Sequence, residues 1–408
     1  MLSDILDAMQ FDHMRDKDPL NTTGAARVTI TFQYATTSQP GDLPSGSTFS
    51  GWTAFTAAEK TAMETQLAHI ESILNVDFVE VAGAADPDLN LGKVTIPGST
   101  AGFGGNSISF SGSTISAWDG FAVFDNTIDL SQPGEENLLL HELAHAMGLK
   151  HPFTGITLPA ATDNNKYTVM SYTDNPDNGE PSDALMLYDV FALQDIWGGA
   201  ANEGGNTTYT GSRTDTVDAI WDTGGTDRFD ASARSNTVRL DLREGKFSKF
   251  GSYDDVAVTF GTTIENATGG SGNDTIRGNN EKNTLNGKAG KDTIFGGGKG
   301  DNIFGGIGAD DLKGQGGKDR LNGGKGGDSL TGGKGNDKFI FAKNGGKDVI
   351  TDFKDDADAV RFKKLGTVSE ILAQAADVGG DVVFDFGGGN VLTVLDTTVA
   401  QISDDILA

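Results

Sequence analysis

The chain carries at residues 141–151 the stretch His141-Glu-Leu-Ala-His145-Ala-Met-Gly148-Leu-Lys-His151. In an α-helix, His141 and His145 stand about one turn apart on one face, so both imidazoles can reach one metal ion. Glu142 lies beside the first histidine, where its carboxylate can take a proton from a metal-bound water. Gly148 tolerates the left-handed conformation that ends a helix, so the chain can return and present His151 as a third ligand. Three protein ligands leave one zinc position open for water, as in a catalytic zinc site.

Histidine is otherwise rare in this chain. The sequence contains five histidines, and three of them lie in this stretch. Such a concentration argues against a chance match in an ordinary amphipathic helix. The other two, His13 and His69, are interpreted as a tail residue and a helix-surface residue without a role.

The same stretch matches the extended zinc motif of the metzincin proteases. Thr168-Val-Met170-Ser-Tyr172 resembles their Met-turn, and together with Tyr188–Gly198 it resembles the serralysin family in particular. The resemblance implies a secreted zinc endopeptidase that hydrolyses peptide bonds of extracellular proteins, with Glu142 as the catalytic base. It also implies that Met170 forms a hydrophobic floor beneath the zinc, and that Tyr172 is a displaceable fifth ligand and a hydrogen-bond donor to the transition state. The segment between His151 and Met170 is shorter than is usual for serralysins. The resemblance therefore says least about the loops that set substrate preference.

Composition limits the other possibilities. A chain of 408 residues favours two domains. A net charge of −27 disfavours nucleic acid and anionic lipid as partners and favours cations. The sequence contains no cysteine and therefore no disulfides. A secreted protein of this kind needs another means of stabilisation, and bound calcium is expected to provide it. No apolar run approaches the ~20 residues of a membrane span, and the acidic N-terminus is not of the Sec signal type.

The first part of the chain predicts an α+β catalytic domain in which a mixed sheet accompanies the zinc-binding helix. Residues 1–25 are interpreted as a tail or pro-segment remnant, and residues 26–199 as the protease domain. A capping box opens one helix, the zinc helix starts near Pro133, and the substrate pairs with a sheet edge near Gly104–Phe110. The expected strands are residues 27–34, 77–81, 93–96, 107–110 and 121–124; the expected further helices begin at Thr56 and span Leu185–Trp197.

A glycine-rich stretch at 198–206 marks the expected boundary to a second domain, residues 200–408. Within it, a nonapeptide repeat occupies residues 269–340. The sixth position of each window is acidic except for Asn283, and the eighth is apolar. The sixth-position acids are Asp274, Asp292, Asp301, Asp310, Asp319, Asp328 and Asp337; the apolar residues are Ile276, Leu285, Ile294, Ile303, Leu312, Leu321, Leu330 and Phe339.

This repeat predicts an all-β parallel β-roll of the RTX type. Glycine-rich turns free backbone carbonyls, and the aspartates add carboxylate oxygens, which together suit calcium. The apolar residue two positions later points inward, so stacked turns build a narrow core. A flexible glycine linker would not keep an apolar residue in every window. The second window, with Asn283, is expected to lack one calcium site, and Lys299 is expected to weaken another.

The segment before the repeat also resembles the serralysin linker, where the family binds additional calcium. Carried across, the resemblance implies the ligands Asp222, Gly224, Asp227, Thr263 and Glu265. Residues 341–408 are expected to form antiparallel strands that cap the roll, at 348–353, 382–386 and 391–395. The end, Asp405-Ile-Leu-Ala408, resembles the signal that type I secretion machinery recognises. The protein is expected to be an extracellular monomer.

Two alternatives stay open. The chain is a calcium-dependent adhesin or surface protein with an inactive protease-like domain, against which the complete ligand set and Glu142 argue. Alternatively, the protease is held latent by residues 1–25, with Asp12 or His13 near the zinc.

Overall fold

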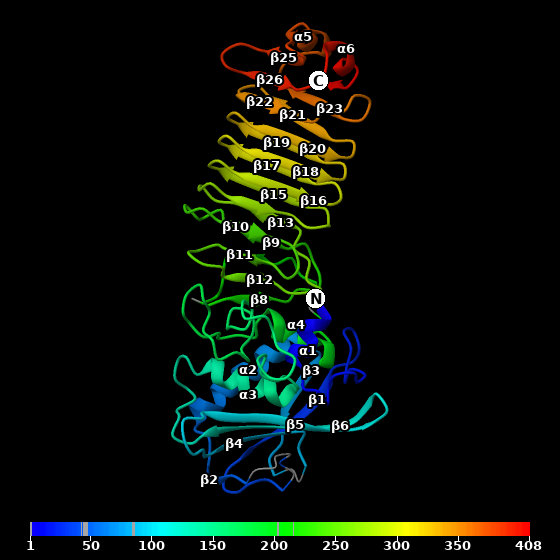
Figure 1. Ribbon diagram of the computed structural model, residues 1–408. Helices are drawn as coiled ribbons and strands as arrows, with labels where there is room; N and C mark the ends of the chain where they lie inside the picture. Colours follow the sequence, from blue (N-terminus) through cyan, green and yellow to red (C-terminus); the bar gives the residue numbers. More distant parts are fainter. Residues whose placement is uncertain (1, 42, 44–47, 84–85, 202–203, 215) are drawn as a thin grey trace. The chain divides into compact units, whose positions relative to one another are not determined.

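The chain forms two compact units in the computed structural model (Figure 1). The first unit comprises Met1–Glu203 with Arg213–Trp221, and the second Gly204–Ser212 with Asp222–Ala408. Positions 202 and 203 of the predicted linker lie outside the described residues, and the predicted domain limits stay a prediction. The structure describes residues 2–41, 43, 48–83, 86–201, 204–214 and 216–408.

A mixed sheet forms the centre of the first unit. Its strand order is β3-β1-β4-β6-β5, with β2 paired to β4. Strands β1, β3, β4 and β6 are parallel, whereas β5 runs antiparallel to β6 at one edge. The predicted mixed sheet is confirmed. The strands of this sheet are β1 (Val28–Ala35), β2 (Ser50–Thr53), β3 (Val76–Glu80), β4 (Leu89–Thr95), β5 (Gly102–Ser111) and β6 (Thr114–Asp125). The short β8 (Asp218–Ile220) is not part of this sheet.

The hairpin of β5 and β6 is longer than the two predicted strands. Glycines at positions 104, 105 and 120 interrupt the alternation of apolar and polar residues. The strands predicted from that alternation were therefore too short. No described helix of the chain has the length and apolar character needed to cross a membrane.

The helix that carries the histidines begins later than predicted. Gly134 has φ of 97°, which no helical residue adopts, so residues around Pro133 form a turn before the helix. The last helix of the unit also begins two residues late, because the Asp189 carboxylate accepts from Met186 N–H at 2.9 Å and caps its start. The helices are α1 (Leu2–Met9), α2 (Ala57–Ile73), α3 (Glu136–Met147) and α4 (Leu187–Trp197).

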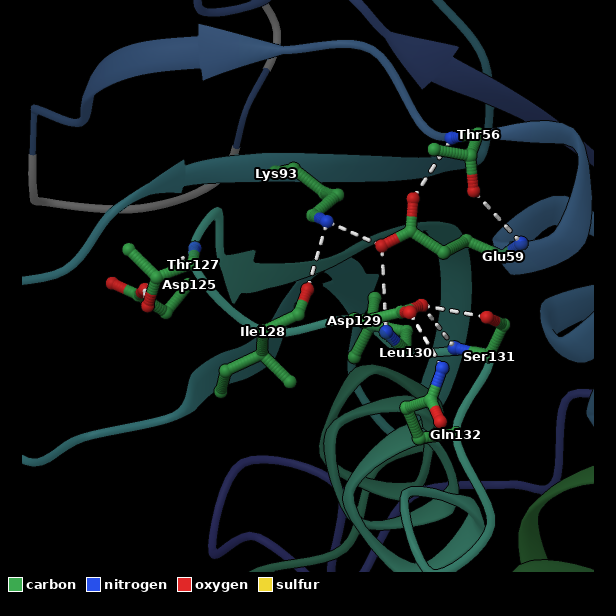
Figure 2. Close-up of polar contacts among 10 residues, drawn as sticks. All are labelled: Thr56, Glu59, Lys93, Asp125, Thr127, Ile128, Asp129, Leu130, Ser131 and Gln132. Atoms are coloured by element: carbon green, nitrogen blue, oxygen red, sulfur yellow. Dashed lines mark hydrogen bonds and ion pairs between the residues drawn. The ribbon is translucent and has the colours of Figure 1, made fainter.

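A buried ion pair fixes the segment that leads into α3 (Figure 2). Glu59, in the capping box predicted for α2, pairs with Lys93 of β4. The Lys93 ammonium also donates to Ile128 O at 2.9 Å, and Leu130 N–H donates to Glu59 Oε1 at 3.3 Å. Both buried charges thus have several partners, which a buried pair needs to offset its desolvation. The network joins α2, the central sheet and the approach to α3.

The N-terminal residues are not the weakly patterned tail that the sequence predicted. Leu2–Met9 form helix α1, and Ile5, Ala8 and Met9 are buried. Leu20 N–H donates to Ile196 O of α4 at 2.7 Å, so the following segment is also docked. The apolar residues of α1 span little more than two turns, which is too short for a clear periodic signal.

The second unit contains the predicted roll (Figure 1). Successive strands alternate between two sheets, and each pairs in parallel with a strand two elements later. The eighth-position apolar residues meet one another in register, as Leu285 faces Ile303 and Ile276 faces Ile294. All of them are buried. The strands are β7 (Thr208–Tyr209), β9 (Arg228–Asp230), β10 (Arg239–Asp241), β11 (Phe247–Ser248), β12 (Val256–Val258), β13 (Asn266–Thr268), β14 (Thr275–Arg277), β15 (Thr284–Ala289), β16 (Thr293–Gly297), β17 (Asn302–Ile307), β18 (Asp311–Gly316), β19 (Arg320–Lys325), β20 (Ser329–Lys334) and β21 (Lys338–Ala342).

The expected antiparallel cap is only partly correct. Strand β22 is parallel to β20 and β26, so residues 348–350 continue the roll, whereas β24, β25 and β26 are antiparallel. The last strand, β27, pairs in parallel with β23. The remaining elements are β22 (Lys347–Ile350), β23 (Ala359–Lys363), α5 (Val368–Leu372), β24 (Ala375–Val378), β25 (Asp381–Asp385), β26 (Val391–Val394), α6 (Val399–Ile402) and β27 (Ile406–Leu407).

Candidate active site and metal sites

The three histidines of the motif converge in the first unit. The Nε2 atoms of His141 and His145 each lie 3.1 Å from His151 Nε2. His141 and His145 lie on α3, and Gly148 ends this helix with φ of 121°, from where the chain returns to His151. A Cβ at Gly148 would lie 2.8 Å from Ile196 Cδ1, so the turn needs glycine for space as well as for conformation.

The outer nitrogens of two imidazoles are held by the main chain. His141 Nδ1 lies 2.8 Å from Val169 O, and His145 Nδ1 lies 2.8 Å from Leu149 O. Because a carbonyl only accepts, each Nδ1 carries the proton and each Nε2 keeps its lone pair for the centre of the cluster. Burial lowers the pKa of His145 to about 3 and of His151 to about 4, so the imidazoles are neutral. Three neutral nitrogens with oriented outer atoms suit zinc.

Glu142 lies on the same helix and is 5% exposed. Burial raises the pKa of its carboxyl to about 8, although the Gly104 N–H of β5 donates to it. A dication nearby would lower this pKa again. A Cβ at Gly104 would lie 2.1 Å from Glu142 O, and one at Gly102 would lie 2.8 Å from Glu142 Oε1. Glycine at both positions therefore lets the edge strand approach α3.

The Met-turn is hydrogen-bonded to helix α4. Met170 is fully buried. The Asp189 carboxylate, 0% exposed, accepts from Thr168 Oγ1 at 2.6 Å and from Val169 N–H at 2.8 Å. Burial raises the pKa of Asp189 to about 7. Since Val169 O holds His141, Asp189 orients the first histidine through the turn.

Tyr172 reaches the cluster from the surface. Its side chain is 71% exposed, and its hydroxyl lies 2.8 Å from His151 Nε2. Its ring stacks on His141 with centroids 5.6 Å apart. The phenol thus contacts the cluster while most of the residue faces solvent.

His69 is not the plain surface residue that the sequence predicted. It is half-buried on α2, and its Nε2 accepts from Leu185 N–H at 3.1 Å. Burial lowers its pKa to about 4, so it stays neutral and acts as an acceptor in the packing of this unit.

The aspartates of the repeat form a buried ladder in the second unit. From Asp292 to Asp337, each Oδ1 accepts from the N–H of the residue 18 positions earlier, as Asp292 does from Asp274 at 2.8 Å. Among the described residues no hydrogen bond reaches the Oδ2 atoms of Asp292, Asp301, Asp310, Asp319 and Asp337. Burial raises the pKa of Asp292 to about 7. A Cβ at Gly287 would lie 2.3 Å from Asp292 Oδ2, so the glycine keeps space open beside this oxygen. Buried carboxylate oxygens without partners, next to open space, suit calcium.

Asp274 and Asn283 differ from this pattern. Asp274 Oδ2 accepts from Gly270 N–H at 2.6 Å. Asn283 Oδ1 accepts from Asn279 N–H at 2.9 Å, and its amide donates to Glu265 O at 3.0 Å. The Asn283 side chain thus has hydrogen-bond partners for its oxygen and its amide without an ion. This supports the prediction that the second window lacks a calcium site.

Asn283→Asp is expected to lower the melting temperature of the protein at low calcium, and high calcium is expected to reduce that loss. The new carboxylate cannot donate to Glu265 O, and a buried unsatisfied group costs about 1–3 kcal/mol. Calcium would then offset the cost. Thermal melting monitored by circular dichroism over a calcium titration tests this. Asn280→Asp, which adds the same charge at an exposed neighbour, is the control. Equal melting curves for the parent and Asn283→Asp at every calcium concentration would contradict the expectation.

The predicted linker ligands gather in part around one pocket of about 420 Å³. Asp222, Gly224, Thr263 and Glu265 line it. Asp227 lies beside it, since its N–H donates to Glu265 Oε2 at 2.7 Å. Glu281 and Lys282 also line the pocket, and the sequence did not indicate them.

Two further aspartates continue the ladder beyond the predicted repeat. Asp348 Oδ1 accepts from Asp328 N–H at 3.1 Å, and Asp358 Oδ1 accepts from Asp337 N–H at 2.8 Å. Their sequence separations of 20 and 21 residues break the regular spacing, which is why the repeat did not reveal them.

Known proteins match both parts of the chain. The family model for the Peptidase M10 serralysin C-terminal region matches residues 193–403, more than half of the chain. Serralysin from Photorhabdus laumondii is 29% identical over 279 residues, covering 59% of this chain and 56% of its own. Serralysin C from Dickeya chrysanthemi is 30% identical over 291 residues, covering 62% and 58%. Metallopeptidase AprA from Pseudomonas marginalis is 28% identical over 297 residues, covering 62% and 60%.

The chain thus spans somewhat more than half the length of these relatives. The match of the family model over residues 193–403 includes the strands of the roll, and the relatives named above are serralysins or a metallopeptidase. On this evidence the chain belongs to the serralysin family.

Proposed function

We propose that the protein is a secreted zinc-dependent endopeptidase that hydrolyses peptide bonds of extracellular proteins and is stabilised by calcium. The observation that carries the proposal is the convergence of the His141, His145 and His151 Nε2 atoms on α3 and its return loop, with the Glu142 carboxylate on the same helix. These three nitrogens would hold the zinc. Zinc, when bound, supplies a Lewis acid for water activation and carbonyl polarisation.

The chain's own groups supply the remaining chemistry. Glu142 takes a proton from the attacking water and passes it to the leaving amine, and the Gly104 N–H keeps its carboxylate oriented. Tyr172, whose hydroxyl already reaches the cluster, donates a hydrogen bond to the oxyanion that develops on the substrate.

The edge strand β5 offers a place for the substrate. It ends the order of the sheet, so an extended peptide can add beside it through main-chain hydrogen bonds. Gly102 and Gly104 bring this strand against Glu142, which would place the scissile bond close to the base.

Calcium in the roll would bind the Oδ2 atoms that lack a hydrogen-bond partner, together with turn carbonyls. These Oδ2 atoms belong to Asp292, Asp301, Asp310, Asp319, Asp328 and Asp337. Asp274 and the five predicted linker residues are proposed as further ligands. Family membership also supports export by type I secretion machinery and an extracellular location. Protein and peptide substrates are the proposed partners, and a net charge of −27 disfavours nucleic acid.

Casein cleavage by the full chain tests the proposal. In saturating calcium, the zinc-loaded protein is expected to cleave casein, and removal of zinc with phenanthroline is expected to abolish cleavage. Added zinc should restore cleavage and added magnesium should not, because magnesium prefers oxygen ligands. A zinc-loaded, calcium-replete protein without cleavage would contradict the proposal and favour the adhesin alternative.

A further inference from the structure

The N-terminal segment pairs with the return loop of the histidine cluster. Lys150 N–H donates to Met9 O at 2.7 Å, and Phe11 N–H donates to Gly148 O at 3.0 Å. The segment therefore runs as a short antiparallel partner along the residues that join the second histidine to the third, His151.

The centre of this pairing lies next to His145. Gln10 and Leu149 form an isolated antiparallel bridge, and Leu149 O is the atom that holds His145 Nδ1. The Gln10 amide in turn donates to Ala192 O at 3.0 Å and to Asp195 Oδ2 at 2.8 Å. The strand-like pairing thus holds the main chain on both sides of Leu149, and the Gln10 side chain ties this pairing to helix α4.

A side-chain relay reaches His145 from the other side. His13 Nε2 lies 2.8 Å from Asn106 Oδ1 on β5, and Asn106 Nδ2 donates to His145 O at 3.0 Å. A carboxamide oxygen only accepts, so His13 donates this hydrogen bond. The Phe11 ring packs against both imidazoles, with its centroid 5.3 Å from that of His13 and 5.9 Å from that of His145.

The burial of this segment distinguishes a permanent support of the site from a removable latency segment. A latency segment blocks the site and must leave it, whereas Met9, Gln10 and Met14 are buried like core residues. His13 and Phe11 contact Asn106 and the outer side of His145, and the His145 Nε2 faces His151 instead. The segment thus supports the histidine without occupying the centre of the cluster.

We propose that the main chain of residues 9–11 and the His13 side chain position the second and third histidines, with His13 acting through Asn106 as a positioning residue. The inference rests on the proposed function for its catalytic consequence, but its effect on zinc binding does not. It also replaces the latency alternative, because loss of these contacts should weaken the site.

His13→Ala in the full chain tests the inference. Loss of the relay is expected to weaken zinc binding about tenfold, the lower end for partners that orient metal ligands. Zinc affinity is measured by competition with a chromophoric chelator, and kcat and KM with a fluorogenic casein peptide. We expect kcat to fall several-fold with KM unchanged. His13→Gln, which keeps a donor for Asn106 Oδ1, is expected to restore most of both.

Asp12→Ala is the matched control, because the Asp12 side chain is 78% exposed and its ion pair with Arg15 is long, 3.6 Å. Thermal melting shows whether His13→Ala stays folded. A folded His13→Ala variant with parental zinc affinity and kcat would overturn the inference, and a rise in kcat would support latency instead. If the parent binds zinc but cleaves nothing, the proposed function fails while the zinc measurement still decides the inference.

Discussion

Glu142→Gln is expected to lower kcat for casein cleavage by about 10²–10⁴, the range of a general base. The amide cannot take a proton from water, yet it matches the carboxylate in shape and still offers an oxygen to the Gly104 N–H. Glu142 is not one of the three converging nitrogen ligands, so zinc affinity should stay within about twofold of the parent. Initial rates on casein, with zinc content measured on the same sample, test this.

Glu136→Gln provides the matched control for this variant. It makes the same change in the first turn of α3, where the Glu136 carboxylate accepts from Gly134 N–H rather than meeting the histidines. Its kcat should equal that of the parent. If Glu142→Gln retained more than about a tenth of parental kcat, Glu142 would not be the base.

Calcium removal is expected to unfold the roll, with loss of most of its far-ultraviolet β signal. Burial raises the pKa of the ladder carboxyls, to about 7 for Asp292 and Asp301. At pH 8, which is above these values, the carboxyls would be ionised although they are buried. A buried charge without a partner costs about 3–5 kcal/mol. A domain has about 5–15 kcal/mol of total stability, so a few vacant sites exceed it. Circular dichroism of the full chain before and after chelation measures the loss.

The Glu142→Gln background suits this measurement because self-cleavage cannot imitate unfolding. Returning calcium should restore the signal, whereas magnesium should not, since it demands a small octahedral site. A spectrum unchanged by chelation would show that the aspartate ladder is stable without ions.

The histidine cluster and the roll were predictable because each is encoded locally. Helix geometry alone predicts that three histidines on one helix and the loop after it can meet. The nine-residue period alone predicts that the apolar residue of each turn is buried. The parallel pairing of Leu285 with Ile303 follows directly from that period.

The supports of the site were not predictable, because they join residues far apart in sequence. Asn106 meets His145 across 39 residues and His13 across 93. Gly104 lies in the predicted substrate edge and Asp189 in the stretch that resembles serralysins, but their contacts with Glu142 and the Met-turn appear only when β5 and α4 pack against these parts. The docking of α1 was missed for the same reason, since a helix this short gives a weak periodic signal.

The ladder of the roll has a direction. Every rung donates its N–H to a carboxylate that comes later in the chain, ending with Asp328 to Asp348 and Asp337 to Asp358. A later rung therefore completes the one before it, and a chain cut after residue 346 would leave two buried N–H groups unpaired, at about 1–3 kcal/mol each. In a stack whose turns are stabilised by their neighbours, the C-terminal strands therefore supply the partners that the last two aspartates of the repeat lack within the repeat itself.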